Sequence, residues 1–363
     1  MTATHYPARN SAQENIKRIS GLLKSQNAFH CNRITANRLY SPTTYLPSHT
    51  PTQRRFHARM DRSCVSRLSD MVQGREIKRG DRTEIPWLTA AAAMAFLRMS
   101  QIDATYCHTV YQVAANKKFP NAADHSIDFQ IACILDPSEW LHLAVGQKDR
   151  LSAAAVLAVR NRFTIPDQQK DGFTHALRLW NMYSVYVLKL LQLYRTPSLT
   201  TIERFERFYQ WQIREAIFSS VCSVWAFFLL SESPVSVNFR HLHDISTSDL
   251  KVRLETIVWE IVSMQQLKPD MTGSNEPWIL CTVDKDVSRI AACVFPAIDR
   301  EGTLKGNLLR LYAPEDANRI LSLYLELEQT AKLPVGRDSH AEQFFRNLVQ
   351  TQSALEQSLG IRQ

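Results

Sequence analysis

The sequence predicts a helix-dominated α/β fold, in which many helices pack around a small central parallel sheet behind a basic, partly disordered N-terminal arm. Long stretches of the chain, above all residues 173–231, carry apolar residues at helical spacing. Two short β-prone runs, residues 129–135 and 278–283, end in acidic residues just before a predicted helix, as strands in α/β sheets do. Residues 1–82 hold 15 Lys and Arg but 5 Asp and Glu, a net charge of +10.

We expect three segments along the chain: a basic, largely disordered arm over residues 1–84, a helix-rich α/β body over 85–333, and a helical tail over 334–363. Residues 12–29 can form one amphipathic helix within the arm. Three explanations of the arm remain open. It is a flexible basic segment, an organelle-targeting segment, or upstream sequence before a true start at Met60.

Within the body, apolar spacing and turn residues predict the order of the elements. Asp136 and Pro137 together mark the start of a helix. The predicted helices cover residues 87–113, 138–159, 173–231, 248–266, 287–294, 314–333 and 339–359, and the predicted strands cover 129–135, 235–239, 278–283 and 308–312, with a turn at 302–306.

Composition excludes several classes of protein. The chain has 10 glycines and lacks the GxGxxG, GxxxxGK[ST] and GxSxG motifs, which disfavours Rossmann dehydrogenases, P-loop enzymes and α/β-hydrolases. Its seven cysteines include no CxxC pair, a pattern that suits the reducing cytoplasm. The longest apolar run, residues 216–231, is shorter than the ~20 residues of a membrane-spanning helix. We therefore expect a buried core helix there and no integral membrane association.

Acidic side chains recur at the ends of predicted strands and on predicted helices. Carboxylate oxygens are the hard ligands that Mg²⁺ and Mn²⁺ prefer, and such ions assist phosphodiester hydrolysis. The candidate acids are Asp136, Asp284 and Asp286 after strands, Glu203 and Glu206 on one helix face, and Asp249 at the start of a helix.

This order of acids resembles the PIN-like nuclease superfamily over residues 129–316, and Thr282-Val-Asp284-Lys-Asp286 is its most specific part. The resemblance implies hydrolysis of RNA or single-stranded nucleic acid by an activated water. The chain departs from the family pattern at Pro137, where the family has a small hydroxyl residue, and in the long gap from Asp249 to Asp284. The resemblance implies Mg²⁺ or Mn²⁺ on Asp136, Asp249 and Asp284, with Glu203 or Glu206 completing the pocket and Asp286 supporting it.

Plainer interpretations stand beside each of these motifs. Asp136 and Asp249 can be simple helix caps, and Asp284 a solvated charge at a strand end. His241-Leu-His243-Asp244 has the donors of a transition-metal site, but the HxHxDH form and a second His pair are absent from the sequence, so a polar surface turn is the better interpretation. Cys107-His108 fits a core cysteine beside an exposed histidine better than a catalytic dyad.

The arginines of the basic arm predict contacts with nucleic-acid phosphates that are independent of base sequence and weaken steeply with salt. The alternative is a solvated arm without a partner. The arginines assigned to this surface are Arg54, Arg55, Arg59, Arg62, Arg79 and Arg82.

Two functions from different classes follow. The first is a metal-dependent nuclease, an endoribonuclease that uses the acidic residues and the basic arm. The second is a non-catalytic helical scaffold or regulatory subunit, which binds a protein partner through the aromatic stretches 180–194 and 205–211. A peripheral membrane role for residues 216–230 is a third interpretation.

Overall fold

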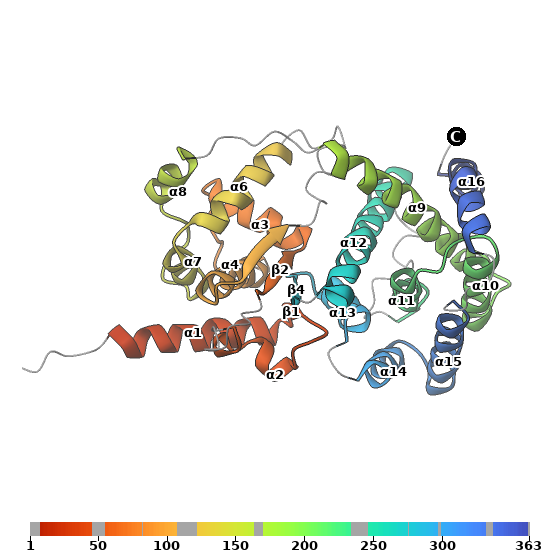
Figure 1. Cartoon of the computed structure of the whole chain (residues 1–363), viewed down its shortest axis with the longest axis horizontal. Helices are drawn as coiled ribbons and strands as arrows, with labels where there is room; N and C mark the ends of the chain where they lie inside the picture. The colour runs from red at the N-terminus through yellow and green to blue at the C-terminus, as the bar shows by residue number, and fades with distance from the viewer. Residues whose placement is uncertain are drawn as a thin grey trace, which may run out of the picture. The chain divides into compact units, whose positions relative to one another are not determined.

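A computed structural model of the chain describes residues 8–45, 55–81, 83–106, 122–162, 170–233, 246–274, 276–296, 299–331 and 337–361 (Figure 1). The fold is dominated by helices and contains one small mixed sheet, which confirms the predicted helix-dominated α/β class. The chain forms two compact units, Met1–Lys170 with Leu267–Ser288, and Asp171–Gln266 with Arg289–Gln363. Each unit is therefore assembled from distant parts of the sequence.

The sheet belongs to the first unit and has the strand order β1-β4-β2-β3. Strand β2 is parallel to both β3 and β4, with Met60 opposite Cys281 in β4, whereas β1 is antiparallel to β4. The sheet is therefore mixed, and among the described residues it contains one of the predicted strands, 278–283, as β4. The strands are β1 (Phe29–His30), β2 (His57–Met60), β3 (Asp103–Tyr106) and β4 (Trp278–Cys281).

Helices surround this sheet in the first unit and make up the second unit. The first unit holds α1 (Ala8–Ser25), α2 (Ala36–Leu39), α3 (Arg62–Val72), α4 (Glu84–Met99), α6 (Ala122–Ile134), α7 (Pro137–Ala144), α8 (Ala153–Arg160) and the first turn of α13 (Lys285–Val294), with a short 3₁₀ turn at Pro42–Thr44. The others are α9 (Lys170–Tyr194), α10 (Thr201–Arg214), α11 (Ser220–Leu229), α12 (Thr247–Gly273), α14 (Arg300–Leu311), α15 (Pro314–Ala331) and α16 (Arg337–Ser358).

Residues 1–84 contain more structure than the predicted largely disordered arm. They supply α1, β1, α2, β2 and α3, and β2 is a central strand of the sheet. Ile19 and Leu23 are buried on one face of α1, and Ala58 and Met60 are buried at alternate positions of β2. The few apolar residues of this region therefore lie at the helix and strand periods, which is enough to join it to the core.

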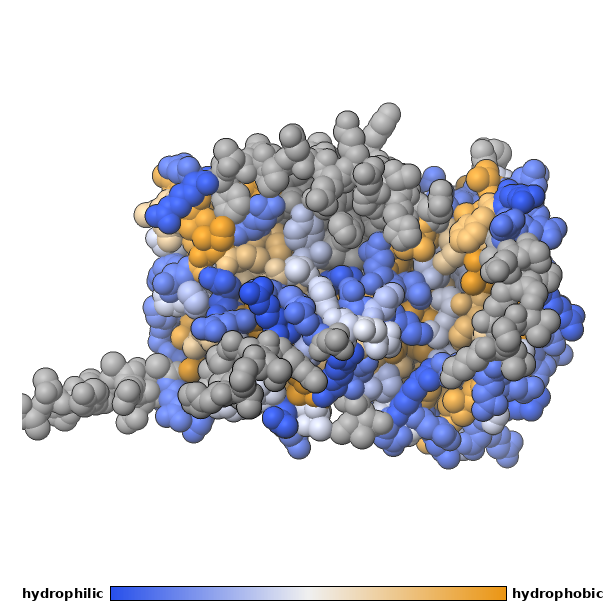
Figure 2. Space-filling model, in the orientation of Figure 1, coloured by the Kyte–Doolittle hydropathy of each residue, from blue (hydrophilic) through white to orange (hydrophobic). Residues whose placement is uncertain are grey.

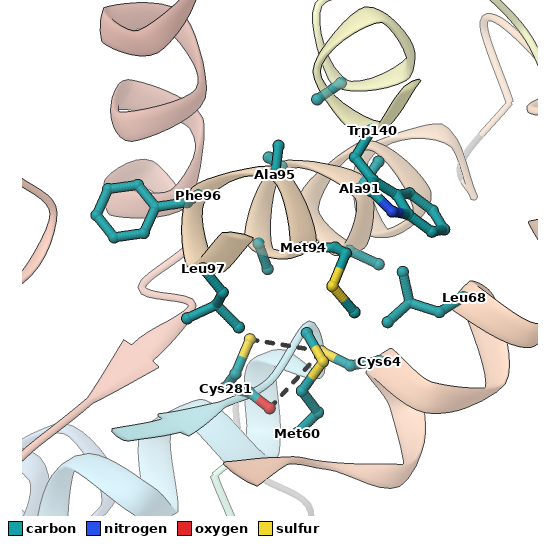
Figure 3. Packing of buried hydrophobic residues seen from close by; sticks show 14 of the residues in the cluster. Met60, Cys64, Leu68, Ala91, Met94, Ala95, Phe96, Leu97, Trp140 and Cys281 are labelled. Carbon is teal, nitrogen blue, oxygen red and sulfur yellow. Dashed lines mark hydrogen bonds between the residues drawn. The ribbon is translucent and has the colours of Figure 1, made fainter. Parts of the chain in front are cut away.

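Helix α4 forms the centre of the first core. The run Ala90–Leu97 is buried, and its alanines let α4 approach α1, α7 and β3 closely. Figure 3 shows this helix above the ends of β2 and β4, with Trp140 of α7 beside it. The fully buried indole of Trp140 donates a hydrogen bond of 3.1 Å to the carbonyl of Ala132 in α6. This hydrogen bond gives the buried indole N–H an acceptor inside the core.

Two predicted strands are helical in the structure. Residues 129–135 form the second half of α6 and the turn after it, and residues 308–312 end α14, which also contains the predicted turn at 302–306. Both runs are apolar and short, so their period alone does not separate strand from helix. Helix α6 is fixed by buried Asp128, which accepts hydrogen bonds of 2.8 Å from Ser69 and Gln73 of the neighbouring segment. The predicted strand 235–239 lies outside the described residues.

In the second unit, α9, α10 and α16 share a core of aromatic rings. The ring of Tyr186 lies 5.0 Å from that of Trp211 and 6.1 Å from that of Phe344. All ten residues of α11 are buried, which confirms the predicted core helix within 216–231. None of the helices in the described part of the chain is long and apolar enough to cross a membrane.

Candidate active site at the carboxyl edge of the sheet

Two acidic residues follow neighbouring parallel strands at the same edge of the sheet. Asp61 comes directly after β2, and Asp284 comes three residues after the end of β4. The backbone N–H of Asp61 donates a hydrogen bond of 2.9 Å to the carbonyl of Cys281, so the strand pairing extends to the acid itself. Ligands in open α/β sheets bind at this carboxyl edge, where the loops leave the strands.

The carboxylate of Asp61 is buried and held by four hydrogen bonds. Oδ1 caps α3 by accepting from the backbone N of Cys64 at 2.8 Å, and the Ser63 hydroxyl lies 2.8 Å from both oxygens. The Thr282 hydroxyl donates to Oδ2 at 2.5 Å. Burial nevertheless raises the pKa of Asp61, and the charge of Asp284 raises it further.

Asp284 is half-buried and begins α13. Its Oδ1 accepts from the backbone N of Asp286 at 2.8 Å and from that of Val287 at 3.1 Å, while its own N–H donates to Thr282 Oγ1 at 3.1 Å. Thr282 therefore touches both acids. Asp286, in the first turn of α13, is also half-buried. The N-termini of α3 and α13 both lie at this edge and stabilise negative charge there.

A buried His–Ser pair fixes α13 against β1. The Ser288 hydroxyl donates to the carbonyl of Asn27 at 2.9 Å, and His30 Nε2 lies 3.2 Å from the same hydroxyl. Burial lowers the pKa of His30 to about 4, so the ring is neutral near pH 7. These buried side chains position the helix that carries Asp284.

The donors of this edge suit a hard divalent cation. The charge of Asp284 raises the pKa of Asp61, which means that the two carboxylates repel each other. A cation bound between them would relieve this repulsion. Mg²⁺ commonly binds through one or two carboxylates and keeps waters or phosphate oxygens as its other ligands. Within the described residues, no group of three or more His, Cys, Asp or Glu is arranged as a metal site. The edge thus fits an open, two-carboxylate site better than a closed cage.

Asp136 occupies a different place from the one predicted. It follows helix α6 and not a strand, and it caps α7 by accepting from the backbone N of Ser138 at 2.8 Å. Hydrogen bonds from Ser138 lower the pKa of Asp136, and the charges of Arg98 and His142 lower it further. The exposed side chain is accounted for by the capping role, because the apolar run before it is helical.

Three further predicted acids belong to the second unit. Glu203 completes a capping box with Thr200, whose amide and hydroxyl lower the pKa of this exposed carboxylate. Glu206 accepts from Arg319 at 3.0 Å. Asp249, in the first turn of α12, accepts from the Ser246 hydroxyl at 2.7 Å. Each of the three therefore has a local partner of its own.

The described arginines that were predicted to contact nucleic acid differ in burial and in their partners. Arg59 is paired with Asp270 at 2.7 Å, and its guanidinium lies 5.0 Å from the centre of the Trp278 ring. Arg79 is bound by Asp149 at 2.8 Å and Glu84 at 3.2 Å, and these acids raise its pKa. Arg55 is exposed and Arg62 half-buried. Arg54, Arg82, His241, His243, Asp244, Cys107 and His108 lie outside the described residues.

Asp61 was missed by the sequence interpretation, although a local signal exists. His57-Ala-Arg-Met60 alternates between half-buried and buried positions, and Asp61-Arg-Ser63 places an acid and a hydroxyl directly after it. The abundance of arginine around this run made it look like part of a solvated arm. No protein-family model, curated protein or solved structure matches this chain, so its function is argued from this geometry.

Proposed function

We propose that the protein is a metal-dependent phosphodiester hydrolase, a nuclease that acts on RNA or single-stranded nucleic acid, with Asp61 and Asp284 as its central acids. The observation that carries the proposal is the pair of carboxylates at the ends of two adjacent parallel strands, joined through Thr282. The raised pKa of Asp61 supports it, because a buried carboxyl beside another acid is stabilised in its ionised form by a bound cation.

In this proposal Mg²⁺ or Mn²⁺ supplies an activated water and neutralises charge on the phosphate. Asp61 and Asp284 bind the cation, and Thr282 and Ser63 keep the Asp61 carboxylate in one orientation. Arg62 and Lys285, the residues directly after the two acids, are cations at the same edge and serve as phosphate contacts. A cytoplasmic location belongs to the same proposal, because the described cysteines are free.

The test is calorimetric titration of the full chain with Mn²⁺, followed by cleavage of a labelled single-stranded RNA. We expect Asp61→Asn and Asp284→Asn each to lower the Mn²⁺ affinity at least ~10-fold, because each removes one of two anionic ligands. Asp136→Asn is the matched control, since its exposed carboxylate caps α7 and follows helix α6, not a strand. Equal Mn²⁺ affinity in all four proteins, or no affinity in the wild type, would exclude this site.

A second candidate function, docking of a protein partner, is favoured by an apolar pair on the second unit. Phe345 is 41% exposed and Val349 is 69% exposed, and their i, i+4 spacing places them on one face of α16. In Figure 2, hydrophobic residues in orange lie among hydrophilic residues in blue near the place of α16 in Figure 1. Contiguous apolar surface of this kind is what a docking partner covers. Sedimentation velocity over a concentration series tests whether the partner is a second copy of this chain. Val349→Glu should abolish that self-association, and Arg346→Glu on the same helix should leave it in place.

A further inference from the structure

Two buried cysteines meet directly beneath the candidate active site. Cys64 lies in the first turn of α3 and Cys281 ends β4, and their sulfurs are 3.9 Å apart. The Cys64 thiol also lies 3.6 Å from the carbonyl oxygen of Cys281. Figure 3 shows the two side chains pointing towards each other below α4. Among the described cysteines, this is the pair whose sulfurs come within 4 Å of each other.

We infer that Cys64 and Cys281 form an oxidative modification site, a thiol pair that a hydroperoxide converts into a disulfide. One thiol gives up its proton, and its sulfur attacks one oxygen of the peroxide. The O–O bond breaks to give a sulfenic acid, and the other oxygen leaves with that proton as water or an alcohol. The second sulfur then attacks the sulfenic sulfur, and the hydroxyl leaves as water with the second thiol proton. Two thiols are oxidised by two electrons in total, and one peroxide is reduced.

The distances make this reaction a local event. A disulfide has an S–S bond of ~2.05 Å, so the two sulfurs must approach by about 1.9 Å from their present separation. Cys64 is in the first turn of a helix, where local opening costs least, and Arg62 and Ser63 beside it are partly exposed. Because Cys64 and Cys281 are themselves buried, hydrogen peroxide must reach them through a local opening of that turn.

A disulfide here would act on Asp61. The backbone N–H of Cys64 donates to Asp61 Oδ1, and Thr282, which donates to Oδ2, is the residue after Cys281. Drawing the two cysteines together shifts both donors at once, so the carboxylate loses its present orientation. The consequence for cation binding rests on the proposed function, whereas formation of the disulfide does not.

The first experiment maps disulfides in the native full chain. The protein is treated with hydrogen peroxide, blocked with N-ethylmaleimide, digested without reductant and analysed by mass spectrometry. We expect a peptide pair linking Cys64 to Cys281, about 2 Da lighter than the two reduced peptides. Cys222→Ala, which removes an equally buried cysteine of the second unit, should retain the link. The absence of this link in native protein, or its appearance only after denaturation, would overturn the inference.

The second experiment compares Mn²⁺ affinity of the reduced and oxidised proteins. A loss of at least ~10-fold on oxidation, reversed by dithiothreitol and absent from Cys281→Ala, is the expected result. A mapped disulfide with unchanged Mn²⁺ affinity would overturn the regulatory consequence and leave the modification site. Absence of Mn²⁺ binding in the reduced wild type would count against the proposed function alone, because peptide mapping judges the disulfide independently.

Discussion

The hydroxyl of Thr282 donates a hydrogen bond of 2.5 Å to Oδ2 of Asp61 and so joins the ends of two parallel strands that lie 221 residues apart in the sequence. The hydroxyl oxygen of Thr282 also accepts a hydrogen bond of 3.1 Å from the backbone N of Asp284. One buried hydroxyl therefore sets the position of both acids. The site is a product of sheet pairing, and its parts are contiguous only in the folded chain.

Replacing Thr282 by Val is expected to destabilise the fold. The side chain keeps its shape, but Oδ2 of the buried Asp61 loses one of its two donors, the other being the Ser63 hydroxyl, and a lost hydrogen bond costs about 1 kcal/mol. Thr282→Ser, which keeps the hydroxyl, should cost less. Urea denaturation of the three proteins provides the measurement, and equal midpoints for Val and Ser would contradict the structural role of the hydroxyl.

The stability of the protein should depend on the ionisation of Asp61. Burial raises its pKa above the unfolded value of 3.8, so the folded state holds this proton more tightly. The resulting stabilisation is complete below about pH 4 and is lost as the pH rises through the raised pKa. Asp61→Asn cannot ionise and still caps α3, so its stability relative to the wild type should increase over that interval.

Denaturation of wild type and Asp61→Asn at a series of pH values from about 4 to about 8 tests this trend. Asp136→Asn is the opposite control. Hydrogen bonds lower the pKa of Asp136, so its ionisation favours the folded state, and its removal should cost more as the pH rises from about 3 to about 5. Parallel curves for wild type and Asp61→Asn would show that Asp61 has an ordinary pKa.

Arg59 and Arg55 should differ although both were predicted to bind nucleic acid. Arg59→Ala removes an ion pair and a cation–π contact and leaves Asp270 without this partner, a loss of about 1–3 kcal/mol of stability. Arg55→Ala, at an exposed position, should change stability by less than about 0.5 kcal/mol.

Fluorescence anisotropy with a labelled single-stranded RNA at several salt concentrations gives the second readout for these arginines. If Arg55 contacts a phosphate, Arg55→Ala reduces the slope of log K against log salt by ~0.7. Weaker binding by Arg59→Ala than by Arg55→Ala, with both proteins equally stable, would assign the phosphate contact to Arg59.

The capping box of α10 predicts a structural role for Glu203. Thr200→Ala removes the hydroxyl that caps the helix and should lower the unfolding free energy by about 1 kcal/mol. Glu203→Gln keeps an acceptor for the Thr200 amide and should leave Mn²⁺ affinity unchanged, as should Thr200→Ala. Loss of Mn²⁺ binding in Glu203→Gln but not in Thr200→Ala would instead identify Glu203 as a metal ligand.

Helices could be predicted from the sequence because their apolar pattern depends on residues three and four positions apart. It located most of α9, α10 and α12, and it identified the apolar run containing α11 as core, which its complete burial confirms. The strand-end position of Asp284 was also predictable, since four apolar residues before it form β4 and a helix follows at once.

The tertiary structure alone decided which acid accompanies Asp284. Residues 57–60 and 129–135 each precede an aspartate, but the sequence predicted a strand at the more apolar run 129–135 and so suggested Asp136. The structure makes that run a helix and pairs the shorter, arginine-containing run with β4. Strands of two to four residues hydrogen-bond to partners far away in the sequence, so composition does not reveal them. Asp61 lies beside Asp284 because the strand before it pairs in parallel with β4.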